Sequence, residues 1–239
     1  MLAIMKREIR AYFTSPLGYV FLAAFCAFSG LFLWLNCLAV GSAVMGGTFQ
    51  MMFFVNMILI PVLTMRTLAD DKRQKTDQLT LTSPVSIFGI VAGKFLGAFA
   101  VFLCASLVML IYGVFLSTAT AQSGGQFDWG SFWGYYAGLI LMGAVFISIG
   151  IFISSLTESQ MISAVGSIGV NIVVCLFDII SSYISNETLA GIINSLSVFY
   201  KYSEFTQGIF SLKNAVFFLS IIIVFNFLTI RVIERRRYA

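Results

Sequence analysis

This 239-residue chain contains no histidine, and charged residues make up only 10% of it. The absence of histidine excludes imidazole metal ligands, b-type haem ligation and nucleophilic triads that depend on a histidine base. The cysteines stand singly in apolar segments, without the C-x-x-C spacing of a metal or redox centre: Cys26, Cys37, Cys104 and Cys175. Such cysteines are expected to be small buried side chains, and no serine or cysteine has a credible base partner. The sequence therefore predicts no catalytic residue and no metal site.

Long apolar runs dominate what is present. The chain is 59% hydrophobic, holds 25 phenylalanines and has a mean hydropathy of +0.97. A helix that crosses about 30 Å of hydrocarbon needs about 20 apolar residues, and hydropathy divides the chain into six such spans: 17–40, 49–66, 90–116, 131–155, 160–183 and 213–233. The first run exceeds the apolar core of a secretory signal, which has about 7 to 15 residues, so we expect it to remain as a span. The prediction is an all-α polytopic membrane protein with a single transmembrane domain over residues 1–239.

Lysine and arginine are distributed unevenly among the loops between these spans. If the N-terminus is cytoplasmic, all of the 14 basic residues except Lys201 and Lys213 fall on the cytoplasmic side. Short basic loops are retained in the cytoplasm. The sequence thus predicts two cytoplasmic termini and places residues 117–130 and 184–212 outside.

Two segments outside the spans carry amphipathic patterns. Residues 1–13 place an apolar group on one helix face and a basic group on another: Leu2, Met5, Ile9, Tyr12 and Phe13 against Lys6, Arg7 and Arg10. Because Pro16 and Gly18 then break the helix, we expect residues 1–16 to form an elbow helix in the headgroup layer; the alternative is a frayed basic tail that only sets topology. Residues 185–212 are too polar to span, but apolar residues recur there at three- and four-residue spacing. They are expected to form helices that lie at, or dip into, the outer face, or else a plain loop on the bundle.

Few polar residues fall inside the predicted spans: Asn56, Asn171 and Asp178, with Lys94 near the inner end of the third span. The two asparagines are expected to form interhelical hydrogen bonds worth about 1 kcal/mol each. Asp178 is expected to be a pathway or interhelical polar group. An ion-coupled secondary transporter usually needs several ionisable groups at membrane depth, so the shortage of charge argues against that class.

One long hydrophilic run, residues 66–86, lies between the second and third spans. It holds charges of both signs, and Leu68, Leu79 and Leu81 give it a little apolar surface. Pro84 ends any helix before the next span. A segment that is cytoplasmic, charged and too short to fold alone suits docking against another protein.

Three stretches of the chain carry a family resemblance: ADDKRQKTDQLTLTSPVS...IVAGKF (69–95), KREIRAYFTSPLGYVF (6–21) and SSLTESQMISAV (154–165). They resemble the permease subunits of ABC-2 type transporters, close to the gliding-motility (GldF-like) branch, and the resemblance covers nearly the whole chain. It implies an elbow helix before six membrane helices, a coupling helix in the first cytoplasmic loop, and re-entrant helices in the last outer loop, 185–212. It also implies the plasma (inner) membrane of a prokaryote as the location.

The resemblance further implies that residues 67–84 seat in a groove of a separate ATP-binding subunit, because this chain carries no ATPase domain. The coupling residues on this segment are then Leu68, Asp70, Asp71, Lys72, Arg73, Thr76, Asp77 and Leu79. Two copies of the ATP-binding subunit would carry ATP and Mg²⁺, with no cofactor on this chain, and a second permease half would complete a homodimer or heterodimer. Membrane lipid and an additional outer-facing protein are the other implied partners, and nucleic acid is not.

The implied function is export driven by ATP hydrolysis, with a substrate that the motifs do not fix. Two other classes stay open: a non-transporting membrane scaffold or insertion factor, and an ion-coupled secondary transporter. Co-purification with an ATPase whose activity responds to this chain separates a permease from a scaffold. Transport driven by an ion gradient without ATP identifies the secondary transporter.

Overall fold

The computed structural model describes residues 2–75, 86–122, 124–183, 197–209 and 211–238, with the backbone alone for 177–183 and 237–238. Within these residues the secondary structure is helical and no strand occurs, which confirms the predicted all-α fold. The elements, in chain order, are α1 (Leu2–Thr14), α2 (Pro16–Leu33), the π-helix η1 (Trp34–Leu38), α3 (Gly46–Thr64), α4 (Ala69–Arg73), α6 (Ile87–Gln122), α7 (Trp129–Leu156), α8 (Gln160–Tyr183), α10 (Val198–Thr206) and α11 (Leu212–Tyr238).

Five helical segments are long and apolar enough to cross a membrane: Pro16–Leu38, Gly46–Arg73, Ile87–Gln122, Trp129–Leu156 and Leu212–Arg236. They coincide with five of the six predicted spans. The remaining predicted span, 160–183, coincides with α8, whose described apolar part, Gln160–Leu176, is shorter. A sixth crossing therefore stays a prediction.

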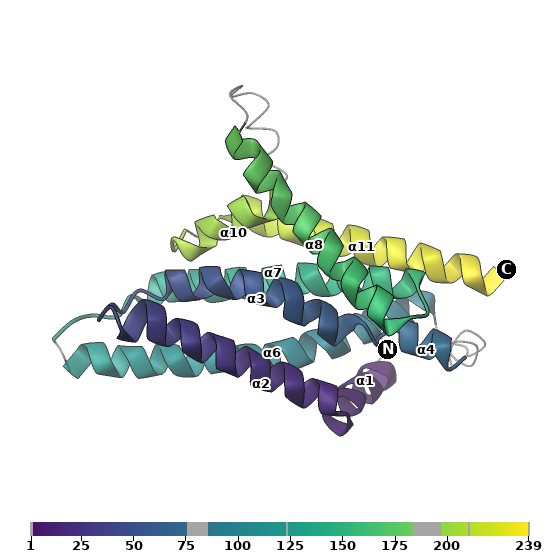
Figure 1. Ribbon diagram of the computed structural model, residues 1–239, viewed down its shortest axis with the longest axis horizontal. Coiled ribbons are helices and arrows are strands. Elements are labelled where there is room, and N and C mark those ends of the chain that lie inside the picture. Colours follow the sequence, from purple (N-terminus) through teal and green to yellow (C-terminus); the bar gives the residue numbers. More distant parts are fainter. Residues whose placement is uncertain (1, 76–85, 123, 184–196, 210, 239) are drawn as a thin grey trace.

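Helix α7 is the centre of the bundle. It packs against α3, α6, α8, α10 and α11, and its most apolar stretch is 72% buried, against 28% for α2 and 17% for α11. Figure 1 shows α2, α3, α6 and α7 running alongside one another, with α8 inclined to them. Both termini, α1 and α4 lie toward one end of the bundle, and α10 lies toward the other.

The break between α1 and α2 follows from Pro16. Proline disfavours helical geometry at the preceding residue, and Ser15 is extended, with φ −103° and ψ 151°. Pro16 occupies the first turn of α2, where its missing N–H would be unpaired in any case. Gly18 permits the tight turn, because a Cβ there would collide with the carbonyl of Tyr12. Residues 2–14 form a separate helix, and its position in the headgroup layer stays a prediction.

Helix α10 is the helical part of the predicted outer segment that the structure describes; the apolar positions at 189–196 lie outside the described residues. It packs against α3, α7, α8 and α11. The Tyr202 hydroxyl donates to the carbonyl of Phe49 in α3 at 2.7 Å. The Phe53 ring centroid lies 5.1 Å from that of Tyr202 and 5.0 Å from that of Phe199. This part of the segment is therefore anchored to the bundle, and its depth in the membrane stays a prediction.

Candidate functional site

The junction between α3 and α4 is held by hydrogen bonds. The last carbonyls of a helix have no partner within it, and the Tyr12 hydroxyl of α1 donates to one of them, the carbonyl of Leu63, at 2.9 Å. Burial, followed by the charge of Glu8, raises the pKa of the Tyr12 phenol, so it stays a donor. The Thr67 hydroxyl donates to the carbonyl of Thr64 at 2.7 Å. The chain therefore leaves α3 in a fixed direction.

Helix α4 is capped by a residue of another helix. Leu68 occupies its N-cap position and provides no capping side chain. The Ser154 hydroxyl accepts from the backbone N–H groups of Leu68 at 3.1 Å and Ala69 at 2.9 Å, and the N–H of Ala69 is one of those that have no partner within the helix. The Lys72 ammonium donates to the carbonyl of Ser155, one of the last carbonyls of α7. Both ends of α4 are thereby bonded to the C-terminal end of α7.

Lys94, in α6, is only 1% exposed. Its ammonium lies 2.9 Å from a carboxylate oxygen of Glu8 in α1 and 2.6 Å from one of Asp71 in α4, and it donates to the carbonyl of Thr67. Three acceptors match the three N–H donors of a lysine, so the buried charge is compensated. Gly97 permits this approach of α1, because a Cβ there would lie 2.7 Å from the Cβ of Glu8. We call Glu8, Asp71 and Lys94 the buried ion triad; it joins α1, α4 and α6.

Asp70 makes a second set of contacts. Its carboxylate accepts from the Gln160 amide of α8 at 2.7 Å. It also lies 3.4 Å from the Arg66 guanidinium and 3.5 Å from that of Arg73. Helix α4 is thus bonded to α6, α7 and α8, and Asp71 also pairs with Arg7 of α1 at 3.8 Å.

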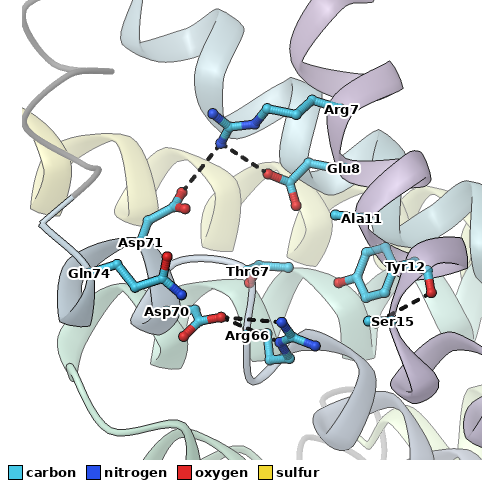
Figure 2. Close-up of a pocket in the computed structure, with 10 residues that line it drawn as sticks. All are labelled: Arg7, Glu8, Ala11, Tyr12, Ser15, Arg66, Thr67, Asp70, Asp71 and Gln74. Carbon is cyan, nitrogen blue, oxygen red and sulfur yellow. Dashed lines mark hydrogen bonds and ion pairs between the residues drawn. The ribbon is translucent and has the colours of Figure 1, made fainter.

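A recess lies between α1 and the α3–α4 junction, as Figure 2 shows. Its volume is about 340 Å³, and it is lined by Arg7, Glu8, Ala11, Tyr12, Ser15, Arg66, Thr67, Asp70, Asp71 and Gln74. Arg7 lies across the recess from Arg66 (Figure 2), 3.6 Å from Glu8 and 3.8 Å from Asp71. Two guanidinium groups and three carboxylates can bind a charged side chain or head group there. In the part of the chain that the structure describes, no cluster of acidic or cysteine side chains is placed to hold a metal ion.

The coupling residues predicted from the sequence divide into three groups. Four contact the chain's own helices and are buried or half-buried: Leu68, Asp70, Asp71 and Lys72. Arg73 is exposed. Three lie outside the described residues: Thr76, Asp77 and Leu79. Leu68 belongs to the apolar core, so any effect it has on a partner is exerted through the position of α4.

Sequence reasoning missed the residues that hold α4: Glu8, Ser154, Ser155 and Gln160. The one available signal was Lys94, which the sequence places near the inner end of a span. A lysine at such depth needs an acidic partner. The candidates were the acidic residues that the predicted topology places at the cytoplasmic end of the spans. Nothing in the spacing of Ser154 distinguishes it from the other serines of its helix.

Asn171 joins α8 to α3 beside a proline. Pro61 lies inside α3 and lacks the N–H that would bond the carbonyl of Met57, four residues earlier. The Asn171 side-chain amide donates to that carbonyl at 3.2 Å. Asn56, the preceding residue of α3, is fully buried, and neither atom of its amide has a partner among the described residues. Asp178 lies on the part of α8 for which the backbone alone is described.

The sequence model of one protein family matches this chain. The family is described as ABC-2 family transporter protein, and the match covers residues 27–237. It extends from within α2 into α11, and it includes α4, Lys94 and Ser154. No curated protein matches the chain.

Proposed function

The chain belongs to the ABC-2 transporter family, and we propose that it is the permease half of an ATP-driven exporter of the gliding-motility (GldF-like) branch. The family supplies the membrane component of ABC transporters, which works with an ATP-binding subunit and is not itself catalytic. Family membership and the five apolar helices make the chain a multi-pass membrane protein. Export is the direction that the resemblance to this branch implies.

The observation that supports coupling through α4 is that four other helices hold it. A segment that only tethers two spans needs no such contacts. In our proposal, ATP-driven closure of the partner displaces residues 67–84. The bonds of α4 to Ser154, Lys94 and Gln160 then pass this displacement to α7, α6 and α8, and the exposed Arg73 meets the partner directly.

The proposed assembly contains a second permease half, because the resemblance makes this chain one half and a symmetric assembly places the pathway on its axis. It is a homodimer, or a heterodimer with a similar permease, with two ATP-binding subunits that carry ATP and Mg²⁺. It lies in the plasma membrane of a prokaryote with both termini in the cytoplasm, and the position of the two termini toward one end of the bundle (Figure 1) supports this topology. Residues 185–212 form the outward-facing segment for an additional partner. Asn56, Asn171 and Asp178 are pathway or interhelical polar groups.

The test begins with recovery of the ATP-binding subunit that co-purifies with the tagged chain from native membranes. The complex is reconstituted in lipid, and its ATP turnover is compared between the parent and Ser154→Ala. Loss of an N-cap costs about 1 kcal/mol, so we expect the complex to assemble while its turnover falls several-fold.

Ser148→Ala is the matched control, because Ser148 is also buried in α7 but donates only to the Val145 carbonyl of its own helix. Equal turnover for Ser154→Ala and Ser148→Ala would remove α4 from the coupling path. An ATPase that binds the parent chain without any change in its turnover would identify a scaffold in place of a permease.

A further inference from the structure

The carboxylates and the arginines around α4 differ in their exposure. Carboxylates turn inward and guanidinium groups turn outward: the acidic side chains are 11% to 20% exposed, and the arginine side chains are 38% to 63% exposed. The acidic residues are Glu8, Asp70 and Asp71, and the arginines are Arg7, Arg66 and Arg73. Gln74 and Lys75, which follow α4, are exposed as well. The sequence shows a segment of mixed charge, whereas the exposed charged side chains among its described residues, Arg73 and Lys75, are basic.

The inward carboxylates are already well bonded. Asp71 lies 2.6 Å from Lys94, Glu8 lies 2.9 Å from the same ammonium, and Asp70 accepts from an amide at 2.7 Å. These distances are those of good hydrogen bonds, about 2.6–3.0 Å. The carboxylates therefore gain little from a further partner.

The outward arginines are held loosely by comparison. The ion pairs of Arg7 are 3.6 Å and 3.8 Å long, that of Arg73 is 3.5 Å, and that of Arg66 is 3.4 Å. Charge-assisted hydrogen bonds are about 2.7–2.9 Å long. These guanidinium groups can therefore form shorter and stronger hydrogen bonds with a further acceptor. A guanidinium has five donors in a fork that fits a carboxylate.

We propose that the ATP-binding subunit binds this surface through an acidic segment, whose carboxylates pair with the exposed arginines at the rim of the recess. We call Arg7, Arg66, Arg73 and Lys75 the basic docking face. This inference rests on the proposed function and adds the chemistry of the partner surface. Complementary charge makes the association fast, specific and dependent on salt.

A protein fits the basic docking face better than a lipid surface does. The recess is a hollow of about 340 Å³ between two elements (Figure 2), and a bilayer surface is flat on this scale and meets only the rim. A protruding segment of a protein can follow this hollow and reach the arginines on its two sides. Basic residues elsewhere at this end, such as Lys6 and Arg235, are exposed and do not line the recess; they remain available to headgroups.

The ATP-binding subunit is the one recovered with the parent, and the experiment measures its affinity for the chain in nanodiscs. The measurement is made at about 50 mM and about 300 mM salt, which lie below and above physiological ionic strength. For the parent, we expect affinity to fall about tenfold between the two. The double variant Arg73→Glu/Lys75→Glu should bind about tenfold more weakly at low salt and lose most of the salt dependence. Arg235→Glu makes an equal change per residue at an exposed site outside the basic docking face and should bind like the parent. Monodisperse elution of each variant verifies its fold.

The outcomes separate this inference from the proposed function. If the parent binds the ATPase but the double variant binds equally well, the acidic partner surface is refuted while the permease function stands. If the double variant loses only co-purifying anionic phospholipid, the face is a lipid site and the inference is overturned. If no ATP-binding subunit associates with the parent at all, the proposed function itself fails.

Discussion

Replacing Lys94 with methionine tests the buried ion triad most directly, because methionine nearly keeps the length of the side chain and removes its charge. The carboxylates of Glu8 and Asp71 lie 2.9 Å and 2.6 Å from the lysine nitrogen. Their side chains are 11% and 20% exposed, so water screens them poorly. The ammonium is the group that allows two acidic residues to be buried side by side.

The magnitude follows from what Lys94→Met leaves behind. The two carboxylates would face each other at about 5 Å, and at an effective dielectric constant of about 20 two like charges at that separation repel by about 3 kcal/mol. Removal of one partner from a buried ion pair costs about 3–5 kcal/mol. Arg7 lies near both carboxylates but is 55% exposed, so it offsets only part of the loss. We expect the free energy of unfolding to fall by about 3 kcal/mol.

The assay is unfolding of the purified chain in mixed micelles by increasing SDS, followed by circular dichroism. Glu8→Gln combined with Lys94→Met removes one of the two facing charges and should recover about half of the loss. Lys6→Met, at an exposed position of the same α1, is the control and should change the free energy by less than about 0.5 kcal/mol. If Lys94→Met costs no more than Lys6→Met, the triad does not hold α1 and α4 on α6, and the reasoning is refuted.

Three further predictions concern the spans and their orientation. Asn171→Leu removes the hydrogen bond to α3 and should cost about 1 kcal/mol in the same unfolding assay, whereas Asn226→Leu, which loses a bond only within its own helix, should cost less; equal losses would count against the interhelical bond. Gly97→Ala should destabilise by about 1–3 kcal/mol because its Cβ would press on α1, while Gly169→Ala, with open space around its Cβ, should stabilise by up to about 1 kcal/mol; the reverse order would contradict the packing. With the four native cysteines replaced by alanine, Gln74→Cys should react with an impermeant thiol reagent only in permeabilised cells, and labelling of intact cells would overturn the orientation.

The helices could be predicted because their cause is local. A long apolar run must satisfy its own backbone, and only a helix does so within one segment. The six predicted spans therefore coincide with helices, five of them long and apolar enough to cross a membrane. The break at Pro16 falls where the proline requires it. The ends of the predicted spans differ from those of the helices where a helix continues beyond its apolar residues. Helix α6 covers Ile87–Gln122, whereas hydropathy predicts a span over 90–116.

The inward face of α4 could not be predicted, because its cause lies far along the chain. The spacing of Asp70, Asp71, Lys72 and Arg73 shows which of them share a helix face, but not which face packs. That choice depends on Ser154, which caps α4 from 86 residues away, and on Glu8 of α1, which shares Lys94 with Asp71. A leucine in a charged loop is expected to be exposed and to contact a partner. Leu68 is instead buried, because the end of α7 lies beside it.

One packing arrangement gives α4 both its rigidity and its basic outer surface. Lys94 and Gln160 bind the carboxylates of α4, and this fixes the helix against the bundle. The same bonds draw negative charge inward, so the side left for a partner carries Arg73 and Lys75. A loop with its acidic residues exposed would be both looser, since no helix would hold it, and nearly neutral toward a partner. In the proposed mechanism, the displacement of α4 and its recognition by the partner therefore depend on the same hydrogen bonds, and a change that frees Asp71 should weaken both together.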